Sequence, residues 1–135
     1  MKKNFLLACL ISAVFAAPAG AWELWDQFKA TNLTPEGRVV DYSEAKLITT
    51  SEGQYYGMFF ALVANDKKAF DEMFAWTEKN LGENQPAWLW GIPDGKPNGT
   101  GKILDTNNAT DSDMWIAYCL IEAARIWNDP SYLPK

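Results

Sequence analysis

SEGQYYGMFFALVANDKKAFDEMFAWTEKNLG (residues 51–82) is the stretch that decides the fold. Nearly every position from 55 to 64 is apolar, and a helix that is apolar all round is typically buried on all sides. Ser51 is followed three residues later by Gln54, a pairing that predicts a capping box at the start of this helix.

A second helix follows after a short turn. Asn65 and Asp66 predict the turn and the cap, and residues 67–81 place apolar side chains on one helical face and charged ones on the other. Gly82 predicts the end of this helix. An apolar inner helix joined to an amphipathic outer helix is the unit of stacked αα-hairpins, so the sequence predicts an all-α toroid or bundle.

The flanking segments extend this pattern. Residues 22–33 predict a short amphipathic helix, and residues 37–50 an extended or irregular segment. Residues 83–109 are rich in Gly, Pro and Asn and predict a long connection, in which residues 88–90 (WLW) place two aromatic side chains on one side if extended. Thr110 predicts the cap of a last, mostly buried helix that runs to about Trp127.

The N-terminus predicts an exported protein. Residues 2–3 are basic, residues 5–16 form an apolar run too short for a membrane span, and residues 19–21 (AGA) form a small-residue cleavage site. We therefore expect a signal peptide over residues 1–21 and a mature domain over residues 22–135 in the periplasm or outside the cell. An uncleaved anchor is the alternative, and the cleavage site disfavours it.

Composition excludes several classes of function. Loss of the two leader lysines takes the formal charge from −5 to −7, which argues against nucleic acid or an anionic membrane as a partner. The chain has no histidine, so Ser-His and Cys-His nucleophiles are excluded within it and a zinc site is disfavoured. We expect no metal and no cofactor. Cys119, the one cysteine after the leader, is expected to be buried and inert.

Acidic residues at two helix starts are the candidates for chemistry. Glu52 lies in the first turn of one apolar helix, and Asp111 and Asp113 lie in the first turn of another. Acids at helix starts are often only stabilised by the helix dipole. A pair of carboxylates is also the apparatus of glycoside cleavage, and the seven tryptophans of the chain suit sugar stacking as well as core packing. A proton donor would need burial to outweigh the pKa-lowering helix start.

The motifs around these residues resemble a known family. Residues 50–58 (TSEGQYYGM) resemble the S-E-G-x-x-Y-G-M segment of glycoside hydrolase family 8. Residues 109–113 (ATDSD) resemble its A-[ST]-D-x-D signature, with Ser112 where Ala or Gly is more usual. Residues 86–91 (PAWLWG) are similar to the branch encoded with bacterial cellulose synthases.

The resemblance implies an (α/α)6 toroid that cleaves β-1,4-glucan with inversion, an endoglucanase (cellulase) without a cofactor. It implies that Glu52 is the general acid and that Asp111 is a catalytic residue that contacts the sugar at the point of cleavage. Trp90 is expected to stack on a sugar ring, and Tyr56 and Asp113 are expected to lie in the substrate cleft. An association with the cellulose synthase machinery is also implied.

One departure from the family concerns size. A toroid needs twelve helices, whereas the sequence predicts about four, and the general base of the family lies further along than residue 135. We therefore expect the N-terminal portion of the catalytic domain, inactive by itself. The alternatives are an inactive truncated hydrolase, a non-catalytic glycan-binding helical module, and a structural helical-hairpin protein that meets a partner through its aromatic residues.

Overall fold

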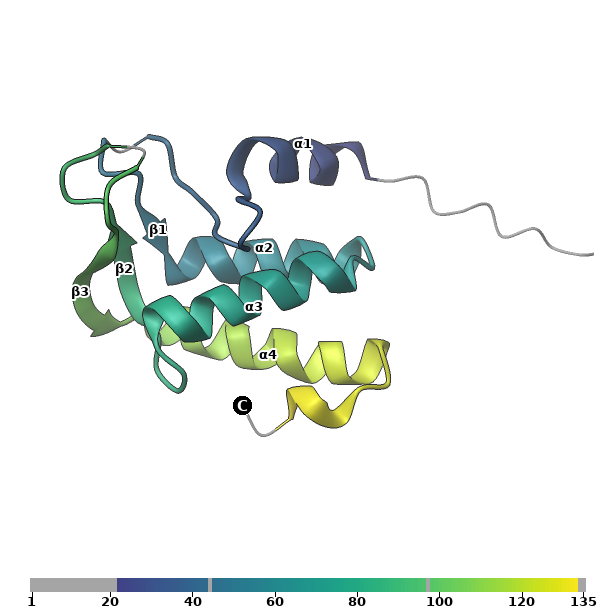
Figure 1. Cartoon of the computed structure of the whole chain (residues 1–135). Helices are drawn as coiled ribbons and strands as arrows, with labels where there is room; N and C mark the ends of the chain where they lie inside the picture. The colour runs from purple at the N-terminus through teal and green to yellow at the C-terminus, as the bar shows by residue number, and fades with distance from the viewer. Residues whose placement is uncertain (1–21, 44, 97, 134–135) are drawn as a thin grey trace, which may run out of the picture.

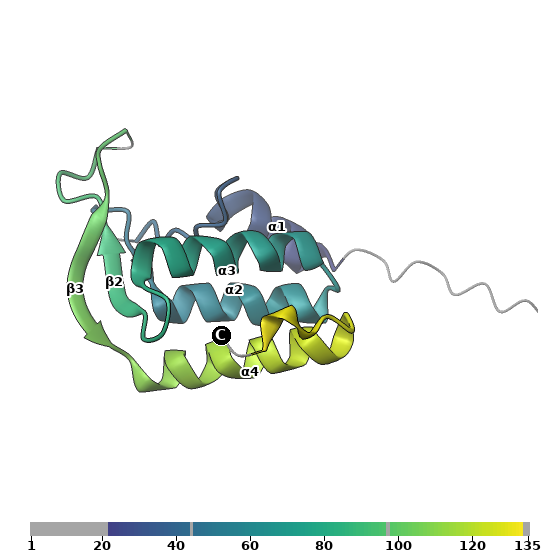
Figure 2. The same ribbon diagram turned by 60° about the horizontal axis from the view of Figure 1, so that its bottom comes forward.

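The computed structural model describes residues 22–43, 45–96 and 98–133. The predicted signal peptide lies outside the described residues. The elements are helices α1 (Glu23–Asn32), α2 (Ser51–Val63), α3 (Lys67–Leu81) and α4 (Thr110–Ile126), a short 3-10 helix (Pro130–Tyr132), and strands β1 (Thr49–Thr50), β2 (Ala87–Gly91) and β3 (Lys102–Asn108). Figures 1 and 2 show the helices side by side and the sheet at one end, where α2 and α4 begin and α3 ends.

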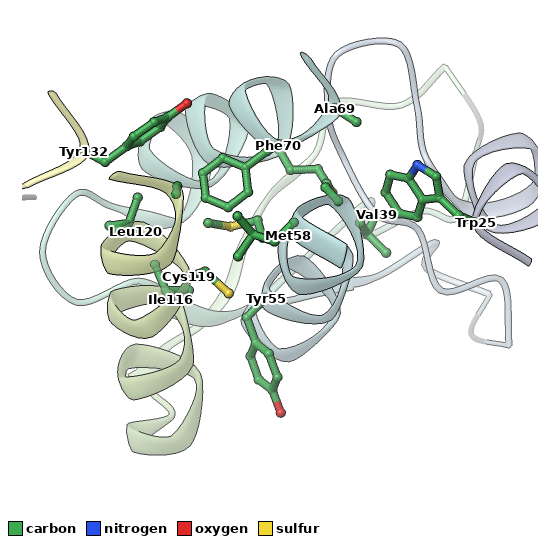
Figure 3. Packing of buried hydrophobic residues seen from close by; sticks show 14 residues of the cluster. Trp25, Val39, Tyr55, Met58, Ala69, Phe70, Ile116, Cys119, Leu120 and Tyr132 are labelled. Atoms are coloured by element: carbon green, nitrogen blue, oxygen red, sulfur yellow. The ribbon is translucent and has the colours of Figure 1, made fainter. Parts of the chain in front are cut away.

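The core lies between α2, α3 and α4. Met58, Phe70, Met73 and Cys119 are all fully buried there, and Figure 3 shows Met58, Phe70 and Cys119 converging from the three helices. Cys119 is a free thiol, so the expectation that it is buried is confirmed. Burial raises its pKa to about 12, which disfavours the reactive thiolate. Tyr55 lies at the edge of this cluster with its hydroxyl group pointing away from it (Figure 3).

The amphipathic α3 has the bounds that its sequence predicts. Asp66 caps it by accepting a hydrogen bond from the Ala69 backbone N–H at 3.1 Å, and Gly82 ends it with a φ of 117°. Phe70 is buried, whereas Lys68 and Glu72 form an ion pair of 2.6 Å on its outer face. A charged face of this kind is typical of a helix that stays next to water.

The predicted cap of α2 is wrong. Thr50 is the N-cap: its backbone is extended and its side chain accepts a hydrogen bond from the Gly53 N–H at 2.9 Å. Ser51 is already helical. Gln54 is buried and instead joins two segments, accepting from the Val39 N–H at 2.7 Å and donating to the Thr77 hydroxyl at 2.9 Å. A buried side-chain amide is almost always hydrogen-bonded. The partners of Gln54 lie in the segment before α2 and on α3, so its side chain does not cap its own helix.

The cap predicted for α4 is wrong too. Ala109 holds the N-cap position and makes no side-chain cap bond, while Thr110 is the first helical residue.

The connection between α3 and α4 contains strands that the sequence analysis missed. β2 and β3 pair antiparallel, and β1 adds to β2 with Thr49 opposite Trp90, giving the order β1-β2-β3. Short strands with irregular register carry a weak sequence signal, because their pairing depends on distant partners. The domain is still dominated by helices, and the sheet covers one end of them.

Helix α2 is not buried on all sides and helix α4 is not mostly buried, so both predictions of burial are wrong for the described residues. On α2, Tyr56 and Val63 are 46% and 61% exposed; on α4, Met114 and Ile121 are 69% and 55% exposed. Both helices are therefore apolar on the side that faces solvent as well as on the side that faces the core. Across the described ranges, no helix combines the length and the apolarity that crossing a membrane requires.

Candidate active site

Two carboxylates converge at the sheet end of the helices. Glu52 lies in the first turn of α2 and Asp111 in the first turn of α4, and these helices pack against each other. Both carboxylates lie within electrostatic range of the Tyr55 hydroxyl. Burial raises the pKa of Tyr55, and a hydrogen bond with Tyr56 and the negative charges of Glu52 and Asp111 raise it further. The structure therefore places both predicted acids at the same end of the helices, within electrostatic range of one tyrosine.

The same two carboxylates are exposed to solvent. The burial that a proton donor would need is therefore not present at Glu52 among the described residues. Glu52 lies in the first turn of α2, at a position that is exposed among the described residues, whereas its neighbours Ser51, Gln54 and Tyr55 are buried.

An aromatic cluster lies directly beside the carboxylates. Tyr55 stacks on Trp115, with ring centroids 5.8 Å apart and planes 8° apart, and its ring lies 4.4 Å from that of Tyr56. Trp115 also meets Tyr118 edge-on at 5.5 Å. Tyr56 and Trp115 are 46% and 42% exposed, so each still offers part of its ring to a ligand. Rings of this kind provide apolar contact area for the C–H faces of sugars.

Trp90 occupies a different environment from Tyr56. It lies on β2, where the Arg38 guanidinium sits 4.2 Å from its ring centroid and Trp76 meets it at 5.4 Å with planes 77° apart. Gly101 approaches so closely that a Cβ there would lie 1.8 Å from Trp90 Cη2. Trp90 is consequently half-buried and held in one orientation, with Arg38 covering one face of its ring.

Asp113 points away from the other two acids. Two residues along a helix are about 200° apart, so Asp113 lies on the side of α4 opposite Asp111. Its Oδ2 accepts a hydrogen bond from Asn108 at 2.5 Å, and its Oδ1 is buried without a partner among the described residues. It borders a hollow of about 60 Å³. The lining of this hollow mixes polar residues, among them Thr77, Glu78 and Glu83, with apolar ones, among them Phe74 and Ile116.

Arg38 is the residue of this region that the sequence analysis missed. Its Nε donates to the Thr49 hydroxyl at 2.8 Å, its Nη2 donates to the Leu47 carbonyl, and burial lowers its pKa. It thus links the segment before α2, strand β1 and Trp90. A single arginine in an irregular segment carries no sequence signal for such a position. In the described part of the chain, no cluster of three or more acids or cysteines is arranged to hold a metal ion.

Comparisons with known proteins agree on one family. The family model described as glycosyl hydrolases family 8 matches residues 2–135. The chain is 48% identical over 136 residues to an endoglucanase of Escherichia coli O157:H7, covering 96% of this chain and 36% of that protein. It is 44% identical over 137 residues to an endoglucanase of Escherichia coli strain K12, covering 98% of this chain and 36% of that protein. The chain thus spans about a third of the length of these curated relatives.

Solved structures show the same relation. The crystal structure of an endo-1,4-D-glucanase from Vibrio fischeri matches with a TM-score of 0.74 and 53% identity, over 82% of this chain and 32% of that one. An endo-β-1,4-glucanase from Acetobacter xylinum matches with a TM-score of 0.70 and 36% identity, over 86% of this chain and 35% of that one. The described helices and sheet therefore reproduce about a third of a larger fold.

Proposed function

This chain belongs to family 8 of the glycosyl hydrolases, and from that premise we propose that it forms the part of an endo-β-1,4-glucanase that carries the proton donor. The observation that carries the proposal is that Glu52 and Asp111 lie in the first turns of two helices that pack against each other, next to the exposed rings of Tyr56 and Trp115. Carboxylates that lie beside aromatic rings, at the N-terminal ends of two neighbouring helices, suit the cleavage of a neutral polysaccharide. The substrate class that we propose is β-1,4-glucan.

In the proposed reaction Glu52 donates its proton to the glycosidic oxygen as the bond to the anomeric carbon breaks. Asp111 contacts the sugar at the point of cleavage and stabilises the positive charge that develops on its ring. Inversion needs a second carboxylate that takes a proton from the attacking water, about 6.5–9.5 Å from the acid. We propose that this base comes from polypeptide other than the described residues.

Glu52 must hold its proton at the working pH to act as an acid. Desolvation raises a carboxyl pKa and a helix N-terminus opposes that effect. Since Glu52 is exposed, we propose that the bound glucan and further polypeptide together exclude water from it. Tyr56 and Trp90 then contact the sugars directly, whereas Asp113 supports the site through Asn108 at the end of β3.

A chimaera tests this proposal. Residues 22–133 would replace the matching third of the Vibrio fischeri endo-1,4-D-glucanase, and release of reducing ends from carboxymethylcellulose would be measured. We expect Glu52→Gln to lower turnover by about 10²–10⁴-fold, as loss of a general acid does. The matched control is Glu36→Gln, an exposed acid in a turn, which should leave turnover unchanged. Near-normal turnover in Glu52→Gln would refute the assignment.

The rival function is a non-catalytic glycan-binding module. The exposed rings of Tyr56 and Trp115 favour it as much as they favour an enzyme. It predicts that the chimaera binds cellohexaose, as measured by calorimetry, but releases no product.

We further propose that the protein is exported and works beside a cellulose synthase. Export is supported by residues 1–21, which carry the sequence features of a signal peptide. Work beside a cellulose synthase is supported by residues 86–91, which are similar to the family branch encoded with bacterial cellulose synthases. Fractionation of cells that express the intact gene, with processing followed by mass spectrometry, tests export. Co-purification with the synthase tests the association.

A further inference from the structure

The Arg38 side chain joins the aromatic ring of β2 to the segment that leads into α2. Its guanidinium lies 4.2 Å from the ring centroid of Trp90. Its Nε donates to the Thr49 hydroxyl at 2.8 Å, and its Nη2 donates to the Leu47 carbonyl. Thr49 precedes Glu52 by only three positions. One side chain therefore contacts both the ring proposed to meet the sugar and the backbone that carries the proposed proton donor.

The backbone on either side of Arg38 is fixed to α2. The Gly37 carbonyl accepts from Gln54 Nε2 at 3.2 Å, and the Val39 N–H donates to Gln54 Oε1 at 2.7 Å. Gln54 is fully buried and belongs to the first turn of α2. Gly37 also passes so close to α3 that an added Cβ would lie 2.0 Å from the Glu72 carbonyl oxygen. Arg38 consequently extends from a base that is held to both helices.

The segment that Arg38 holds is strained and leads directly into α2. Leu47 has a φ of 48°, a left-handed conformation that residues other than glycine rarely adopt and that persists only where neighbouring contacts maintain it. Thr49 is fully buried, and its hydroxyl donates to the Val39 carbonyl at 2.6 Å while it accepts from Arg38. Thr50 then caps α2. Loss of the Arg38 hydrogen bonds should therefore let this segment relax and displace the start of the helix.

Trp90 is held from several directions at once. Thr49 pairs with it in the sheet, Arg38 lies over its ring, and Trp76 meets it with planes 77° apart. The close approach of Gly101, where a Cβ would lie 1.8 Å from Trp90 Cη2, restricts the ring further. Because Trp90 is still only half-buried, part of its ring can meet a ligand in this one orientation.

We propose that Arg38 is a positioning residue, which sets the place of the Glu52 carboxyl group relative to a glucan chain resting against Trp90. The inference rests on the proposed function, in which Glu52 is the proton donor and Trp90 contacts a sugar. Arginine suits this task because its planar fork makes two directed hydrogen bonds while its face lies on an aromatic ring, which the compact ammonium of lysine cannot do. Placement of this kind matters, since a shift of about 1 Å can cost about 100-fold in rate.

Two substrates separate a positioning role from a structural one. In the chimaera of residues 22–133 with the Vibrio fischeri endo-1,4-D-glucanase, kcat and KM would be measured on cellohexaose and on β-cellotriosyl fluoride. Cellohexaose needs a placed proton donor, whereas fluoride leaves with little help from an acid. We expect Arg38→Met to lower kcat on cellohexaose by about 10–100-fold and kcat on the fluoride by less than about 3-fold. Partial unfolding lowers both rates equally, so the ratio of the two rates reports only placement of the acid.

Two further variants change the contacts of Arg38 more gently. Arg38→Lys keeps the charge but not the paired hydrogen bonds, and Thr49→Val removes the hydroxyl that accepts from Nε. Each should lower the ratio less than Arg38→Met does. Arg125→Met is the matched control, because it removes an exposed arginine whose ion pair lies on α4, and it should leave the ratio unchanged.

The outcomes distinguish this inference from the proposed function. Equal losses on both substrates in Arg38→Met would overturn the positioning role, and so would a selective loss in Glu52→Gln that no Arg38 variant shares. Either result would leave the proposed function standing. Parental cleavage of cellohexaose by Glu52→Gln would instead overturn the proposed function, and the positioning role with it.

Discussion

Arg38 shows how much a single side chain contributes to the sheet end of this protein. Its guanidinium lies over Trp90, donates to the Thr49 hydroxyl and reaches the Leu47 carbonyl. Among the described residues no carboxylate pairs with it, so its charge is balanced by an aromatic face and by oxygen dipoles. A cation–π contact stabilises a protein more when it is partly buried than when it is fully exposed to water.

Replacing Arg38 should therefore loosen Trp90 and its neighbours. We expect Arg38→Met to lower the free energy of unfolding by about 2–3 kcal/mol, because a cation–π contact and hydrogen bonds from a charged donor are lost together. Urea denaturation followed by tryptophan fluorescence measures the change. Arg125→Met is the control: its ion pair with Glu122 is exposed, and its loss should lower stability by at most about 1 kcal/mol. Equal losses in both variants would contradict this account.

At the residue scale, the sequence predicted the helical positions of Glu52 and Asp111 but not what surrounds them. The helix-start signals in the sequence predicted that Glu52 and Asp111 lie in the first turns of their helices, and the structure confirms these positions. Their exposure could not be predicted, because it depends on which other segments cover them. The direction of Asp113 could have been predicted from helical periodicity, since it lies two positions from Asp111.

Among the elements, those with a strong local pattern were predicted best. The bounds of α3 match the prediction because its apolar stripe, its Asp66 cap and its terminal Gly82 all agree. The cap of α2 was displaced by one residue, since the extended backbone at Thr50 (φ −103°, ψ 152°) follows from its pairing with β2. The strands were missed because they pair over long sequence distances.

Thr50 and Ser51 are the two candidate N-caps of α2, and replacing them should affect stability differently. Thr50→Val removes the hydroxyl that accepts from the Gly53 N–H and should cost about 1 kcal/mol of stability. Ser51→Ala removes a buried hydroxyl with no partner among the described residues, and should be neutral or slightly stabilising. Chemical denaturation of both variants measures the difference. A larger loss of stability in Ser51→Ala than in Thr50→Val would contradict the observed cap and support the capping box that the sequence predicts.

At the scale of the whole molecule, Asp66 ties α1 to the helical hairpin. It accepts hydrogen bonds from Trp25 at 3.1 Å and Lys29 at 2.9 Å, both on α1, while also capping α3. Burial alone would raise the pKa of Asp66, but the bonds from Lys29, the Ala69 N–H and Trp25 outweigh it and hold the pKa below its usual range. One carboxylate thus joins segments about forty residues apart.

Acid should loosen this junction. Because the pKa of Asp66 is lower in the folded state, its contribution is present above the unfolded pKa of about 3.9 and is lost as the pH falls through the folded value. Urea midpoints measured between about pH 6 and pH 2 should fall less steeply in Asp66→Asn than in the parent chain. Asp26→Asn, which removes only an exposed partner of Lys29, should keep the parental slope. Parallel curves for Asp66→Asn and the parent chain would contradict this role.

The pair of Trp76 and Trp90 has a consequence for spectroscopy. Their indole planes are 77° apart at a centroid separation of 5.4 Å, and two chromophores that close and that strongly inclined share their electronic excitation. The pair should therefore give an exciton couplet, a positive and a negative band side by side, in the ultraviolet circular dichroism spectrum. Since Trp76 belongs to α3 and Trp90 to β2, that signal reports the docking of sheet against helix separately from the helical content itself.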